Sequence, residues 1–136
     1  LQILKGGIAR ITVGEKAEFF DVHAKLLCQK SPFFDKALNG DFSEGASKVV
    51  HLPSDEPAIV AEFVRWLYLG QVFKGQGLKD LTHESLIRIW VLADKLQVPS
   101  LQNHVADRFI DPAIGLHRQD GAEDLFLHRL HVVRHV

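Results

Sequence analysis

Alternating apolar and polar residues open the chain. Residues 8–13 place apolar side chains at every second position, which is the period of a strand with one buried face. A second strand pattern follows at residues 17–22, after the short turn Gly14-Glu15-Lys16, so we expect a hairpin. Residues 48–52 indicate a third short strand.

The rest of the chain shows helical periodicity. Ser31 before Pro32, and Thr82 before another periodic run, are typical helix starts, while Gly40 and Gly70 are typical ends. The predicted helices cover residues 23–29, 31–40, 55–70, 82–96 and 99–110, with one more candidate from about Glu123. Strands first and helices mostly later predict an α+β fold in which helices cover a small sheet.

Several stretches resemble one known family, in the right order. They are Ile11-Thr12-Val13-Gly14, Phe20-Asp21-Val22-His23-Ala24-Lys25, Ser31-Pro32-Phe33-Phe34, Trp66-Leu67-Tyr68-Leu69-Gly70 and Ala93-Asp94-Lys95-Leu96. Together they resemble the BTB/POZ domain family. The resemblance implies a three-stranded sheet covered by about five to six helices, with the domain at residues 8–110 and a C-terminal extension holding part of a helix at residues 111–136.

The function that this resemblance implies is protein–protein interaction. Members that bind cullin-3 carry a hydrophobic-x-Glu motif, and Phe42-Ser43-Glu44 stands at that place. An adaptor of this kind would put Phe42 into an apolar groove on the cullin and use Glu44 at the rim. The alternative for Phe42 is packing on its own core. The candidate partner-binding residues are Asp41, Phe42, Ser43, Glu44 and Tyr68.

A homo-oligomerising BTB domain in a regulatory protein is the second interpretation. Dimerising members of the family carry an aspartate where this chain has Ile8, preceded here by Gly6-Gly7. The additional strand that those members exchange between partners is not found ahead of it. Both departures weaken the dimer interpretation.

Composition narrows the partners further. Sixteen Lys and Arg oppose seventeen Asp and Glu, a net charge of -1, which does not favour nucleic acid. The longest apolar run, Ile89 to Ala93, is far too short to span a membrane, and no signal peptide opens the chain. Cys28 is the only cysteine, which fits a reducing compartment. We therefore expect protein partners, no membrane, and a cytoplasmic or nuclear location.

Reactive chemistry has few candidates. Cys28 and His23 form no recognisable catalytic pair, and neither a phosphate loop nor a dinucleotide fingerprint is present. Four residues near the C-terminus follow metal-ligand spacing on one helix face: Asp124, His128, His131 and His135. A solvated polar face opposite Phe126, Leu130 and Val133 is the favoured explanation, and a metal-binding domain is the third interpretation. We expect no enzyme, no cofactor, no resident metal and no small-molecule substrate.

Overall fold

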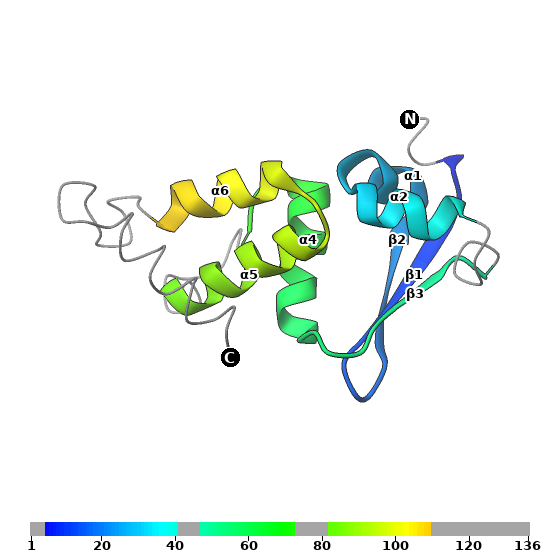
Figure 1. The fold of residues 1–136 in the computed structure, drawn as a ribbon, viewed down its shortest axis with the longest axis horizontal. Coiled ribbons are helices and arrows are strands. Elements are labelled where there is room, and N and C mark those ends of the chain that lie inside the picture. Colours follow the sequence, from blue (N-terminus) through cyan, green and yellow to red (C-terminus); the bar gives the residue numbers. More distant parts are fainter. Residues whose placement is uncertain (1–4, 41–46, 73–81, 110–136) are drawn as a thin grey trace.

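The computed structural model describes residues 5–40, 47–72 and 82–109. Three strands lie within these ranges: β1 (Ile8–Val13), β2 (Glu18–His23) and β3 (Val49–Leu52). Five helices accompany them: α1 (Ala24–Lys30), α2 (Pro32–Asn39), α4 (Pro57–Leu69), α5 (His83–Lys95) and α6 (Pro99–Phe109). In Figure 1, α4 stands between the sheet with α1 and α2 on one side and the α5–α6 pair on the other. The predicted α+β class, with a small three-stranded sheet, is confirmed.

The sheet has the strand order β2-β1-β3. β1 and β2 form the predicted antiparallel hairpin, in register from Ile8 opposite His23 to Val13 opposite Glu18. Gly14 turns the chain with a φ of 80°, a left-handed conformation that suits glycine. β3 joins the other side of β1 in parallel. β2 begins one residue later than expected because Ala17 belongs to the turn, with its N–H bonded to the Gly14 carbonyl.

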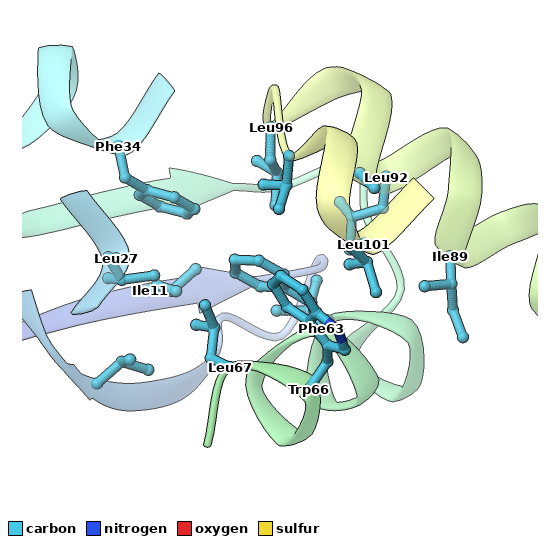
Figure 2. Packing of buried hydrophobic residues seen from close by; sticks show 14 of the residues in the cluster. Ile11, Leu27, Phe34, Phe63, Trp66, Leu67, Ile89, Leu92, Leu96 and Leu101 are labelled. Atoms are coloured by element: carbon cyan, nitrogen blue, oxygen red, sulfur yellow. The ribbon is translucent and has the colours of Figure 1, made fainter. Parts of the chain in front are cut away.

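The core lies between the inner face of the sheet and the helices. Phe34 from α2 and Phe63 from α4 are fully buried and stack with their ring centroids 6.1 Å apart. Fully burying a side chain of this size stabilises the fold by about 1.5–3 kcal/mol. Figure 2 shows these two rings among apolar side chains of the sheet and the helices, including Ile11, Leu27, Leu67, Leu92, Leu96 and Leu101.

Local chemistry at the helix ends explains where the helices start and stop. The Ser31 side chain accepts a hydrogen bond from the Phe34 N–H and caps α2. Thr82 caps α5 in the same way through the Ser85 N–H. Gly70 ends α4 in the left-handed conformation, with its N–H bonded to the Trp66 carbonyl at 2.8 Å. The predicted starts at Ser31 and Thr82 and the predicted end at Gly70 therefore match the structure.

The described helices have 13 residues at most, and none of them is long and apolar enough to cross a membrane. The predicted extension at residues 111–136 lies outside the described residues.

Candidate partner-docking site

Tyr68 lies in the last turn of α4 and keeps 45% of its surface exposed. Its hydroxyl oxygen accepts a hydrogen bond from the His23 backbone N–H at 3.0 Å. The same hydroxyl lies 2.6 Å from the His23 ring Nδ1, where its own proton is free to be donated. The two rings meet edge to face, 5.9 Å apart. Tyr68 thus offers a fixed, exposed ring whose polar atom is already satisfied.

This arrangement differs from what the local sequence suggests. A histidine at the junction of a strand and a helix can bond exposed backbone groups, but the His23 ring pairs with the Tyr68 hydroxyl. The Tyr68 ring is 45% exposed, whereas the nearby Trp66 ring packs into the core and is only 8% exposed. Only the fold brings these two side chains, His23 and Tyr68, together, because His23 is the last residue of β2 and Tyr68 lies in the last turn of α4.

Leu69 extends the apolar surface beside Tyr68 and is 51% exposed. Trp66 and Leu67, two positions before Tyr68 and Leu69, face the core instead. A helix turns by about 100° per residue, so residues two positions apart point to roughly opposite sides. The end of α4 therefore carries two large exposed apolar side chains on a well-anchored helix, which is typical of a protein contact rather than of a solvated face.

The other predicted contact residues, Asp41, Phe42, Ser43 and Glu44, lie outside the described residues. The structure therefore does not bring them together with Tyr68, and their role stays a prediction. A hydrogen bond connects the described residues on either side of this segment. Lys48 donates from Nζ to the Leu38 carbonyl at 2.7 Å, which places a cation at the C-terminal end of α2.

The outer face of the hairpin carries residues that the sequence reasoning missed. Phe19 is 56% exposed and Ile8 is 51% exposed. Arg10 lies over the Phe19 ring, 3.9 Å from its centroid, and binds both carboxylate oxygens of Asp21 at 2.8 and 3.0 Å. These hydrogen bonds lower the pKa of Asp21. The alternation of side chains along the two strands could have predicted this exposed face, because these residues occupy the outward positions of β1 and β2.

Cys28 does not have the surroundings of a nucleophile. It is half-buried against the core, and burial raises the pKa of its thiol, with the nearby Asp35 carboxylate acting in the same direction. A thiol of this kind stays protonated near neutral pH, and the thiolate is the reactive form. Its neighbour is the Asn39 amide, whose Nδ2 lies 3.6 Å from the sulfur.

Surface hollows near the start of α4 are lined by charged residues. One of 170 Å³ has Ile59, Val91 and Leu92 at its floor. Ion pairs between Arg88 and Glu56 and between Lys95 and Asp55 occupy its rim. Among the described residues no group of histidine, cysteine and acidic side chains is arranged to hold a metal ion. The predicted tail residues, Asp124, His128, His131 and His135, lie outside the described part of the chain.

Comparison with known proteins agrees with this architecture. The BTB domain of human gigaxonin superposes with a TM-score of 0.58, covering 74% of this chain and 75% of that chain. At 17% sequence identity, this likeness concerns the fold alone. Kelch-like protein 30 of Homo sapiens is 36% identical over 88 residues, and that of Mus musculus is 30% identical over 88 residues. Either match covers 65% of this chain and 14% of the length of the relative.

The sheet, its helical cover and the structural neighbour define an α+β domain of the BTB type. The family model of the BTB/POZ domain matches residues 9–112, and the chain belongs to this family. The resemblance read from the sequence is thus confirmed. The chain is a protein–protein interaction module, of a family that is not typically enzymatic.

Proposed function

We propose that this BTB domain is an adaptor module that docks a cullin-3 ubiquitin-ligase scaffold. The exposed Tyr68–Leu69 pair at the end of α4 is the observation that carries the proposal. The proposed contact residues are Asp41, Phe42, Ser43, Glu44 and Tyr68. The similarity to kelch-like protein 30 gives further support, although the chain spans only 14% of that relative.

Energetics favour a small number of anchors in such a contact. Phe42 would enter an apolar groove of the cullin, where an aromatic anchor typically contributes most of the binding free energy. Tyr68 suits a position next to this anchor. Its hydroxyl is bound by His23, so covering the ring leaves no polar group of the side chain without a partner. Glu44 would make a polar contact at the rim, where contributions are smaller.

The test is a calorimetric titration of the folded chain with the N-terminal half of cullin-3. We expect Phe42→Ala to weaken binding by about 2 kcal/mol, which is about thirtyfold. Tyr68→Ala should weaken binding less, and Glu44→Ala least. The matched control is Phe19→Ala, because Phe19 is an equally exposed aromatic on the outer face of the sheet. This control should bind like the unchanged chain.

Two results would contradict the proposal. One is that the folded, unchanged chain does not bind cullin-3. The other is that Phe42→Ala and Tyr68→Ala bind as tightly as Phe19→Ala. Circular dichroism on each variant separates lost binding from lost folding. Light scattering on the same samples measures the mass in solution and so tests the alternative function, which is self-association.

A further inference from the structure

β2 is an edge strand, and the outward backbone groups of Phe19 and Asp21 lack partners among the described residues. The Arg10 N–H donates to the Lys48 carbonyl and the Gly14 N–H to the Leu52 carbonyl, so the even-numbered residues of β1 face β3. In a strand, the backbone groups of successive residues point to opposite sides. The odd-numbered residues of β1 therefore face β2.

The register then fixes which residues of β2 point away from the sheet. Ile11 stands opposite Phe20 and Ala9 opposite Val22, so these residues of β2 face β1. The N–H and C=O groups of Phe19 and Asp21 consequently point to the free edge. His23 belongs to the same outward set, and its N–H is the one that the Tyr68 hydroxyl binds. That bond confirms the direction and closes the edge at its C-terminal end.

Free edges of this kind bind extended chains, and natural proteins usually protect them with lysine, proline or a bulge. β2 has the sequence Glu-Phe-Phe-Asp-Val-His, which contains no lysine or proline. Phe19, at the open end of the edge, leaves 56% of its surface to solvent. Arg10 holds the ring from the side of β1. An incoming strand would find four backbone groups and a fixed aromatic side chain.

Charge decides which chain fits this edge. Glu18 begins β2 and lines a hollow of about 570 Å³ at the end of the hairpin, together with Glu15. Neither carboxylate forms an ion pair with a residue that the structure describes. Asp55 and Glu56 line the same hollow but are already paired with Lys95 and Arg88, so Glu15 and Glu18 supply its unpaired negative charge and Lys16 is the cation of its lining. A basic partner would be attracted to this end of β2. A second copy of this chain would be repelled, because it would bring the same acidic strand to the edge.

We propose that the free edge of β2 binds an extended segment of a partner protein by strand addition, and that this segment alternates apolar and basic residues. Its apolar side chains would pack on Phe19, because aromatic residues pair well with β-branched ones across strands. Its basic side chains would lie beside Glu18 and the acidic hollow. This surface is separate from the proposed cullin contact.

The experiment uses a capped octapeptide of alternating valine and lysine as its probe, with NMR detection of amide exchange. We expect binding to slow exchange of the Phe19 and Asp21 amides. The Phe20 amide, which faces β1, serves as the internal reference. A valine–glutamate octapeptide should bind at least about tenfold more weakly, the equivalent of about 1.4 kcal/mol. Equal binding of the two peptides would overturn the charge argument.

Two further peptides test strand addition without changing the protein. One is N-methylated at every valine and the other at every lysine. Only one of these sets of amides can face β2, so one peptide should lose binding and the other should keep it. Loss in both peptides, or in neither, would overturn the proposal.

Variants of the protein test the same strand addition by removing a donor from β2 instead of from the peptide. Phe19→Pro removes one free-edge donor together with the aromatic ring, leaves the hydrogen bonds to β1 in place, and should weaken binding by at least roughly tenfold. His51→Pro is the matched control, because His51 faces the free edge of β3 on the opposite side of the sheet. It should bind the peptide normally. Equal affinity of the two variants would overturn the proposal.

Discussion

Replacing Ser31 with alanine tests how the hairpin half of the fold is tied to the α5–α6 half. Ser31 is fully buried and its hydroxyl makes two hydrogen bonds. It accepts from the Phe34 N–H at 3.1 Å, which caps α2. It also donates to the Leu96 carbonyl at 2.6 Å, directly after the end of α5. One small side chain therefore joins two helices that are far apart in the sequence.

The expected cost has two parts. Loss of a Ser or Thr cap costs about 1 kcal/mol. Leaving the Leu96 carbonyl without its hydroxyl partner in the interior adds about 1–3 kcal/mol. We therefore expect Ser31→Ala to lower the free energy of unfolding by about 2–4 kcal/mol, a large share of the stability of an ordinary domain.

Urea unfolding followed by circular dichroism measures this loss as a shift in midpoint at constant slope. Thr82→Ala is the matched control, because Thr82 caps α5 through the Ser85 N–H but is exposed to solvent. It should lose only the capping part, about 1 kcal/mol. If Ser31→Ala loses no more stability than Thr82→Ala, the bond to Leu96 contributes nothing and the reasoning is refuted.

Two further predictions concern titratable groups. Burial, and then the neighbouring Arg108, lower the pKa of His104 from its ordinary value of 6.5, and its Nε2 accepts the Val72 N–H. The free energy of unfolding should therefore be highest above pH 6.5 and should fall as the pH drops through the lowered pKa that His104 has in the folded chain. Urea midpoints measured on both sides of pH 6.5 should show this fall. The variant His104→Gln should make the midpoint depend less on pH. Cys28, with its raised pKa, should react with iodoacetamide more slowly in the folded chain than in urea, as mass spectrometry can measure. Equal rates would contradict the assignment.

Much of the fold could be predicted from the sequence because its signals are local. Ser31 before Pro32, Thr82 before a helical run, and Gly70 after one are each recognised without knowing the rest of the chain. The same holds for the hairpin, whose two strands are joined by a short turn. These features depend on backbone groups a few residues away, which the sequence places beside each other.

Pairings between distant residues could not be predicted in this way. Alternation shows that residues 49–52 form a strand, but not that this strand runs parallel to β1 and leaves β2 at the edge. The bond between His23 and Tyr68 spans 45 positions, so no local pattern contains it. The orientation in which that bond holds the exposed Tyr68 ring is therefore a property of the fold and not of a local pattern.

The last turn of α4 serves the core and the surface at once, and this determines how docking can be tested. Trp66 and Leu67 are each only 8% exposed and stabilise the fold, whereas Tyr68 and Leu69 leave about half of their surface to solvent. A change at Trp66 or Leu67 that abolished partner binding would say nothing of contact, because it would also open a cavity in the core. A change at Leu69 removes exposed apolar surface and leaves the core in place. Loss of cullin binding by Leu69→Ala in a chain of unchanged stability would therefore place the contact on this helix end, while unchanged binding would restrict it to the segment around Phe42.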